Sequence, residues 1–264
     1  MNYTIQNKNF DIRRTFLCGQ CFRWSEDENG AFSGIAGGRS LTVTQSGDEV
    51  TMHGVSEQDI PFWENYFDLG TDYSAYIETL SADETLKKAC EFSPGIRILR
   101  QEPFETLISF IISQNNNIPR IKGCIEKLCE RFGGFPSAGR IARSGPKGLD
   151  GMGLGYRQDY IIDAAIAYHG NGDGSTERIL RGLTYEEAMR YLTTWRGIGP
   201  KVANCICLYG LGHKEAFPRD VWIKRIEAEH FGGHFPEGDY PGYAGVLQQY
   251  IFFYERESRH ERGI

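Results

Sequence analysis

A lysine that follows a glycine-rich turn is the first residue of this chain whose position suggests chemistry. Lys201 comes directly after Gly197-Ile198-Gly199-Pro200, and a segment of helical periodicity lies on each side of that turn. Two glycines so close together allow a tight turn with accessible backbone N–H groups, and Pro200 suits the first turn of a helix. Amides at a helix start can bind an anion such as a phosphate of a nucleic-acid backbone. The alternative is a plain turn between two helices.

The expected position of Lys201 favours its uncharged form. A cation near the positive end of a helix is unfavourable by roughly 0.3–1 kcal/mol. A neutral lysine is a nucleophile suited to imine chemistry, whereas the alternative is an ordinary surface lysine. Asp220 lies nineteen residues later, after Pro218 and before an apolar segment. It either only caps that helix or also faces Lys201, where it would stabilise positive charge on a sugar or shuttle a proton.

The composition indicates a globular protein. The chain has 264 residues, of which 40% are hydrophobic and 24% charged, enough for one large domain or two modest ones. The best apolar run, Thr106–Ile112, is far shorter than the roughly 18 residues of a membrane span, and Met1–Asp11 lacks a signal pattern. We therefore expect no membrane partner and a cytoplasmic location, nucleoid-associated if the source is prokaryotic.

The charge distribution leaves nucleic acid open as a partner. The net charge of −6 argues against a polyanion. Residues 1–93 carry a charge of −8 and residues 159–264 carry −3, but residues 94–158 carry +5. A positive central segment between acidic ends can attract DNA locally.

The seven cysteines do not predict a disulfide framework or a metal site. Their number is odd and no secretion signal is evident. Cys18-x-x-Cys21 could bind zinc or act in redox chemistry, but no second pair lies at ligand spacing. We expect no metal ligands among these residues.

The periodicity predicts an α+β fold. Short strands are expected at Phe16–Trp24, Ala31–Ile35 and Ser40–Thr44, with turns between them, and they suggest a small antiparallel sheet. Helical spacing begins near Ser56, and Ser81–Glu84 form a capping-box pattern. Further helices are expected after Pro103 and at Ile118–Phe132, Arg157–Tyr168, Tyr185–Trp195, Pro200–Tyr209, Asp220–Phe231 and Gly242–Arg256.

The predicted domain organisation follows this change of period. Residues 1–93 form an N-terminal domain, in which flanking helices accompany the antiparallel sheet. Residues 94–264 form a helical region of two lobes that contains the helix-hairpin-helix motif. N-terminal-side and C-terminal helices partly complete the second lobe. We expect Lys201 and Asp220 to lie in the cleft between the lobes.

Several motifs, in order along the chain, resemble the 8-oxoguanine DNA glycosylase/AP lyase family of the helix-hairpin-helix superfamily. The hairpin with its lysine and the later aspartate are accompanied by five segments that extend from about residue 16 to 256. They are Cys18–Trp24, Ser113–Arg120 with its Asn-Asn-Asn-Ile run, Gly153–Arg157, Lys201–Leu208, and Tyr243 through Gln248 to Phe252. The chain lacks the four-cysteine cluster of iron–sulfur glycosylases in this superfamily.

The resemblance implies a reaction without a cofactor. Lys201 attacks the sugar C1′ and releases the oxidised base, and the Schiff base that forms allows the strand to break by β-elimination. Asp220 stabilises the transition state. Trp222 stands two residues after Asp220, where many members of the family have histidine. This departure puts in doubt a pocket or 5′-phosphate contact and leaves the chemistry unaffected.

The resemblance also implies the residues that recognise the DNA. The base is flipped out of the helix, and Tyr156 fills the gap. Asn115, Arg120 and Arg157 hold the cytosine left behind, and Gly197 and Gly199 contact the backbone. In the pocket, the Gly19 carbonyl accepts the N7–H of 8-oxoguanine. The remaining pocket residues read and sandwich the base: Gln248 at its Watson–Crick edge, Phe252 and Cys205 on its faces.

These residues also have ordinary structural interpretations. Asn115–Asn117 can end a helix, Tyr156 can pack in a loop, and Gln248 can be solvated. Phe252 and Cys205 can belong to the core. An ordinary interpretation of each residue separately does not predict all of them in one chain and in this order.

We therefore expect a monomeric enzyme that removes 8-oxoguanine opposite cytosine from double-stranded DNA and then cleaves the strand. One alternative is a glycosylase without lyase activity that acts on alkylated or mismatched bases and uses Asp220 to activate water. The other is a non-catalytic module that uses the hairpin only to contact the DNA backbone.

Overall fold

The computed structural model describes residues 1–80, 83–170, 172 and 174–262. The chain folds into two compact units that are discontinuous in sequence. Unit 1 comprises residues 1–35, 39–100 and 213–264, and unit 2 comprises residues 36–38 and 101–212. The domain boundary that we predicted after residue 93 stays a prediction.

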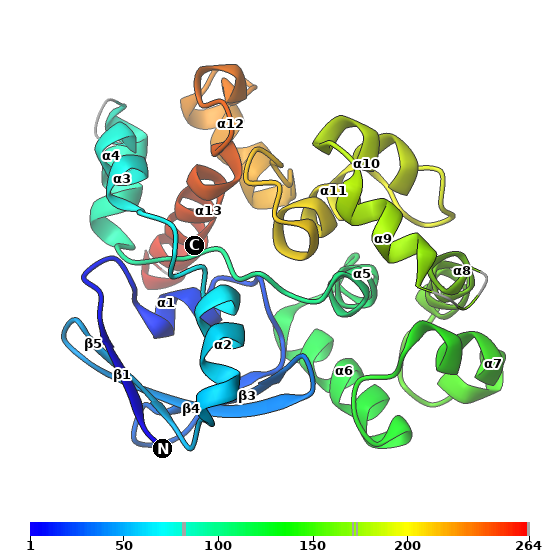
Figure 1. Ribbon diagram of the computed structural model, residues 1–264. Helices are drawn as coiled ribbons and strands as arrows, with labels where there is room; N and C mark the ends of the chain where they lie inside the picture. The colour runs from blue at the N-terminus through cyan, green and yellow to red at the C-terminus, as the bar shows by residue number, and fades with distance from the viewer. Residues whose placement is uncertain (81–82, 171, 173, 263–264) are drawn as a thin grey trace. The chain divides into compact units, whose positions relative to one another are not determined.

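Unit 1 contains the antiparallel sheet that the first fifty residues predict (Figure 1). Among the described residues the strand order is β1-β5-β4-β3-β2, and Val43 pairs with Met52 across β4 and β5. Leu41 and Val43 of β4 are buried, whereas Thr42 between them is partly exposed, so one face of the sheet is apolar. The strands are β1 (Tyr3–Gln6), β2 (Trp24–Glu26), β3 (Phe32–Ala36), β4 (Arg39–Ser46) and β5 (Glu49–His53).

The strand predicted over Phe16–Trp24 is wrong for most of its length. Helix α1 (Ile12–Leu17) occupies the start of this segment, because the side chain of Asp11 accepts a hydrogen bond from the N–H of Arg14 and caps the helix. Only Trp24 lies in a strand. The rings of Phe16 and Trp24 stack at 4.1 Å in the core, so their apolar character reflects packing and not an extended backbone.

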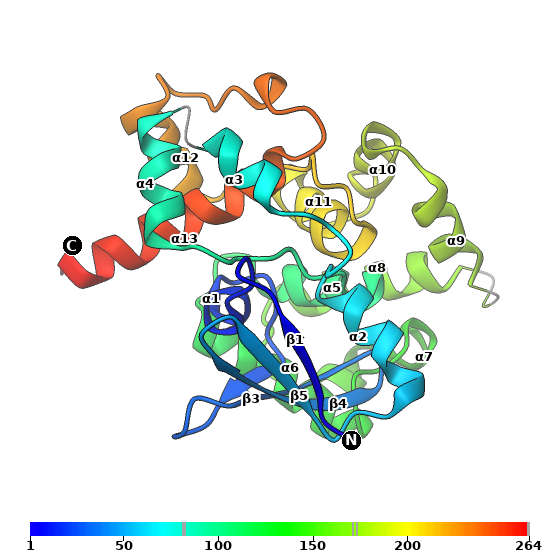
Figure 2. The same ribbon diagram turned by 60° about the vertical axis from the view of Figure 1, so that its left-hand side comes forward.

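The remaining helices of unit 1 lie in two separate parts of the sequence. Residues 213–264 join residues 39–100, and in both views α4 runs beside α13 (Figures 1 and 2). The capping box predicted over Ser81–Glu84 is wrong, because the N-cap of α4 is Asp83, whose side chain accepts hydrogen bonds from the N–H groups of Thr85 and Leu86; Ser81 and Ala82 lie outside the described residues. The helices are α2 (Ile60–Tyr66), α3 (Ser74–Leu80), α4 (Glu84–Phe92), α12 (Val221–His230) and α13 (Ala244–Arg262), with the 3₁₀ turns Glu57–Asp59 and Glu237–Asp239.

A buried ionic cluster holds the middle of unit 1 together. The side chain of Asp68 is fully buried and forms two ion pairs. Its Oδ2 atom lies 2.6 Å from Nζ of Lys214, and its Oδ1 atom lies 2.6 Å from Nη2 of Arg100. Burial alone raises the pKa of the Asp68 carboxyl, but the hydrogen bond and charge of Lys214, with the charge of Arg100, lower this pKa below its ordinary value. The cluster therefore ties the segment after α2 to residues that follow position 213.

Unit 2 consists of helices that surround the buried helix α5 (Figure 1). The helices predicted after Pro103 and at Ile118–Phe132 and Arg157–Tyr168 are confirmed with small shifts, and the one that begins at Tyr185 ends at Leu192. The helix predicted over Pro200–Tyr209 becomes a π-helix after Cys205. The elements are α5 (Pro103–Ile112), α6 (Ile118–Phe132), α7 (Ala138–Leu149), α8 (Arg157–His169), α9 (Ser175–Gly182), α10 (Tyr185–Leu192), α11 (Pro200–Cys205) and the π-helix Ile206–Leu211.

Across the part of the chain that the structure describes, no helix combines the length and the apolarity that crossing a membrane requires.

Candidate active site

The predicted hairpin forms a tight turn between α10 and α11 in unit 2. Gly197 adopts a left-handed backbone with φ of +82°, and a Cβ atom at this position would lie 2.3 Å from Cγ of Tyr160. The carbonyl of Gly197 accepts a 2.8 Å hydrogen bond from Nε2 of Gln114. Gly199 is the N-cap of α11 with φ of −89°, a conformation that other residues also adopt. Glycine is therefore required at Gly197 on both steric and conformational grounds.

Lys201 lies in the first turn of α11 with its amine turned toward α5. Its Nζ atom is 3.2 Å from Oγ of Ser113 and 5.2 Å from the centroid of the Phe110 ring. No carboxylate of the described residues forms an ion pair with this half-buried amine. The amine therefore lies at a helix start, between a hydroxyl and an aromatic ring, and forms no ion pair within the described residues. This placement is compatible with the nucleophile that the sequence predicts.

The segment Ser113–Asn115, directly after α5, connects the predicted site residues of unit 2. Ser113 contacts Lys201, and the side chain of Gln114 holds the hairpin. Asn115 adopts a left-handed backbone with φ of +46°, and its Nδ2 atom lies 3.3 Å from the hydroxyl of Tyr156. The sequence predicts no function for Ser113 or Gln114. The signal that points to them is their place at the end of a buried helix, directly before three asparagines.

The residues predicted to hold the opposite cytosine differ in their exposure. Arg157 is only 5% exposed, and it donates from Nε to the carbonyl of Gln114 at 2.7 Å and from Nη2 to that of Asn115 at 3.0 Å. Its guanidinium also lies 4.6 Å from the centroid of the Tyr156 ring. Tyr156 is 49% exposed, and the exposed Arg120 donates to the carbonyl of Gly153 at 3.1 Å. Arg157 therefore supports the segment that carries Asn115.

Cys205 lies four residues after Lys201 and is buried. Residues four apart in a helix share one face, so the thiol and the amine project from the same side of α11. The sequence-based prediction that both belong to one site is compatible with this placement.

The other predicted pocket residues belong to unit 1, where α13 passes the turn that contains Gly19. A Cβ atom on Gly19, whose φ is +82°, would lie 3.5 Å from Cε1 of Phe252. One turn earlier on α13, Gln248 donates from Nε2 to the carbonyl of Pro218 at 3.0 Å. The Oε1 atom of Gln248 is buried and has no hydrogen-bond partner within the described chain. The structure therefore brings Gly19 and Phe252 together and leaves a buried acceptor one turn from them.

Asp220 is the N-cap of α12, also in unit 1. Its Oδ1 atom accepts hydrogen bonds from the N–H groups of Trp222 at 3.0 Å and Ile223 at 2.9 Å. The predicted capping function of Asp220 is confirmed. The carboxylate that caps α12 is the same group to which the predicted chemistry assigns stabilisation of positive charge. Trp222 lies under the guanidinium of Arg225, at 5.3 Å from its ring.

Cys18, the first cysteine of the CxxC pattern, is not an activated thiol. All seven cysteines are free, and Cys18 and Cys21 are both buried. Burial raises the pKa of the Cys18 thiol to about 11, against the opposing charge of Arg256. At neutral pH this thiol is therefore protonated and weakly nucleophilic.

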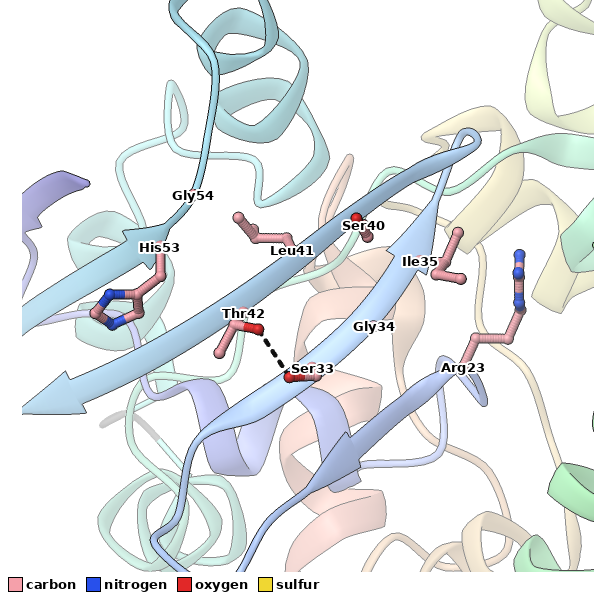
Figure 3. A pocket seen from close by; sticks show the side chains of 9 residues that line it. All are labelled: Arg23, Ser33, Gly34, Ile35, Ser40, Leu41, Thr42, His53 and Gly54. Atoms are coloured by element: carbon pink, nitrogen blue, oxygen red, sulfur yellow. Dashed lines mark hydrogen bonds between the residues drawn. The ribbon is translucent and has the colours of Figure 1, made fainter. Parts of the chain in front are cut away.

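A hollow of about 480 Å³ lies on the sheet of unit 1 (Figure 3). Thr42 and Ser33 both line it and share a 2.8 Å hydrogen bond, and the side chains of Arg23 and His53 lie at opposite ends of the group of lining residues. None of the predicted site residues lines this hollow.

Two family models match consecutive parts of the chain. Residues 2–107 match the N-terminal domain of 8-oxoguanine DNA glycosylases, and residues 108–235 match the HhH-GPD superfamily of base excision DNA repair proteins.

Individual relatives agree with these matches. A probable N-glycosylase/DNA lyase of Methanothermobacter thermautotrophicus is 30% identical over an alignment of 235 residues, and the match covers 74% of this chain and 74% of the relative. An N-glycosylase/DNA lyase of Saccharomyces cerevisiae is 39% identical over an alignment of 162 residues, and the match covers 53% of this chain. The structure of the Clostridium acetobutylicum 8-oxoguanine glycosylase/lyase in complex with double-stranded DNA containing cytosine opposite 8-oxoguanine has 33% identity and a TM-score of 0.89, and the match covers 98% of both chains. The matched region spans only 43% of the yeast relative.

Proposed function

We propose, because this chain belongs to the 8-oxoguanine DNA glycosylase family of helix-hairpin-helix proteins, that it removes 8-oxoguanine opposite cytosine from double-stranded DNA and then cleaves the abasic strand. The observation that carries this proposal is the amine of Lys201, which lies beside Ser113 and Phe110 without a counterion among the described residues.

The proposed reaction begins at the sugar. Nζ of Lys201 forms a bond to C1′ as the bond from C1′ to N9 breaks, and the purine leaves with the electron pair and takes up a proton. The amine loses its own protons as the sugar ring opens and a Schiff base forms. Loss of a C2′ proton then expels the 3′ phosphate by β-elimination. Asp220 contributes negative charge while the sugar is positively charged.

The proposed base pocket uses contacts on every side of the flipped purine. Phe252 and Cys205 contact its faces. The Gly19 carbonyl accepts the N7–H, which 8-oxoguanine has and guanine lacks. The unpaired, buried Oε1 of Gln248 supports this proposal, because the Watson–Crick edge of a guanine offers N–H donors to such an acceptor.

The proposed DNA contacts lie on unit 2. Tyr156, which is half exposed, fills the space of the flipped base, and Asn115, Arg120 and Arg157 hold the cytosine. Arg157 holds the Asn115 segment through the carbonyls that it already contacts. Gly197 and Gly199 bring the hairpin backbone to a phosphate. We further propose that the protein acts as a monomer, without a membrane partner, in the compartment that holds the DNA.

The test is borohydride trapping on a duplex with 8-oxoguanine opposite each of the four bases. We expect a covalent adduct with the wild type, most rapidly opposite cytosine, and none with Lys201→Gln. The control is Lys127→Gln, on the exposed side of α6, which should trap like the wild type.

Two other results would overturn the proposal, and each would favour one of the two alternative functions. Base release without an adduct would indicate the monofunctional glycosylase. Equal affinity for damaged and undamaged duplexes, with no release, would indicate the binding module.

A further inference from the structure

Helix α13 carries two buried polar atoms that have no hydrogen-bond partner within the described residues. They are Oε1 of Gln248 and Nη1 of Arg256. The two residues are eight positions apart and Phe252 is midway between them, so all three project from one face of the helix. An unpaired acceptor, an aromatic ring and an unpaired donor therefore follow one another along this face.

The other atoms of Arg256 are firmly held. Its side chain is only 15% exposed, Nη2 donates to the carbonyl of Leu17 at 2.6 Å, and Nε donates to Glu257 at 2.7 Å. Its Nη1 atom lies 3.5 Å from the position of a Cβ atom on Gly19. The guanidinium carbon is 5.4 Å from the centroid of the Phe252 ring. The unpaired donor is thus fixed beside the two pocket residues of unit 1.

Helix α13 also fixes the backbone that leads to Gly19. Arg256 binds the carbonyl of Leu17, and Nε2 of Gln249 donates to the carbonyl of Cys18 at 3.4 Å. The next carbonyl, that of Gly19, accepts no hydrogen bond from the described residues. Two successive carbonyls are therefore held from one helix, and the third is left for a ligand.

The unpaired Nη1 donor of Arg256 indicates that a bound ligand supplies the hydrogen-bond acceptor. Buried N–H groups are nearly always paired, and a charged donor that stays unpaired is especially costly. A guanine-type base carries carbonyl oxygens as well as N–H groups, so it can satisfy both Arg256 and Gln248.

We propose that Arg256 is a specificity-determining residue of the base pocket. Its Nη1 donates a hydrogen bond to a carbonyl oxygen of the flipped purine, while its Nη2 holds Leu17 so that the Gly19 carbonyl is placed to accept the N7–H. This inference rests on the proposed function. It assigns to Arg256 a contact with the base and none with the sugar or with Lys201.

The experiment separates recognition of the base from chemistry at the sugar. Single-turnover rates are measured for Arg256→Met and Arg256→Lys on a duplex with 8-oxoguanine opposite cytosine and on one with a preformed abasic site opposite cytosine. Loss of a charge-assisted hydrogen bond should slow base release by Arg256→Met about tenfold or more. Cleavage at the abasic site, where no base is present, should stay within about twofold of the wild type. Arg256→Lys keeps one charged donor nitrogen, so its rate of base release should fall between those of the wild type and Arg256→Met.

Arg259→Met is the matched control, because Arg259 lies one turn further on α13 and pairs with Glu255 and Glu229 outside the pocket. It should change neither rate. An equal loss of both rates in the Arg256 variants would indicate a structural role only, and unchanged base release would indicate no role, so either result overturns the inference. If Arg256→Met does not fold, Arg256→Lys decides by the same criterion. Absence of 8-oxoguanine release by the wild type would instead refute the proposed function itself.

Discussion

Replacement of Gly197 by alanine tests whether the hairpin depends on this glycine. A non-glycine residue in the left-handed region costs about 1–2 kcal/mol. The new Cβ would also overlap the Tyr160 ring, with 2.3 Å to Cγ and 2.4 Å to Cδ2, so the ring must turn from its preferred rotamer at a cost of about 0.5–1.5 kcal/mol. Gly197→Ala should therefore lower the free energy of unfolding by about 2–3 kcal/mol.

The matched control is Gly199→Ala, two residues further on. Its φ of −89° is allowed for alanine, and no other atom lies within 4 Å of the position that the Cβ would take. The loss of about 0.5 kcal/mol at an N-cap is offset by a similar entropic gain from the unfolded chain. We expect the free energy of unfolding to change by less than about 0.5 kcal/mol.

The assay is denaturant unfolding of both variants, followed by titration with an undamaged duplex. A loss of 2–3 kcal/mol corresponds to a fall in Tm of about 5–10 °C for a chain of this length. Because Gly197 lies in the proposed phosphate contact, affinity should also fall for Gly197→Ala. Equal stability of the two alanine variants would refute the reasoning, since φ and steric space would then not distinguish the two glycines.

The remaining predictions concern two side chains that have several partners each. Asp68→Asn should lower the free energy of unfolding by about 3 kcal/mol at pH 7, because it leaves the positive charge of Lys214 without its buried partner; urea unfolding measures this change. The difference in free energy of unfolding between the wild type and Asp68→Asn should be complete above about pH 5 and should shrink as the pH falls through the lowered pKa of Asp68. A difference that stays constant down to about pH 2 would show that the charge of Asp68 is not its source. Arg157→Lys should weaken binding to a duplex with 8-oxoguanine opposite cytosine by about tenfold, because lysine cannot hold the carbonyls of Gln114 and Asn115 together; undiminished affinity in a fluorescence titration would show that this support is dispensable.

The sequence by itself determined the α+β class, most helices of unit 2 and the hairpin with Lys201. These features depend on local rules: periodicity, caps, and the turn chemistry of glycine and proline. The motifs that carry the family resemblance were equally readable, because each occupies a short stretch of chain.

Only the tertiary structure decided the features that depend on contacts between distant residues. Phe16 belongs to a helix and stacks in the core on the ring of Trp24, which lies in a strand. Gln114 joins the hairpin to the asparagine segment across 83 positions of sequence, and Arg256 binds a carbonyl 239 positions away. Periodicity reports which face of an element is apolar, but it does not report which partner a polar side chain will find once the chain has folded.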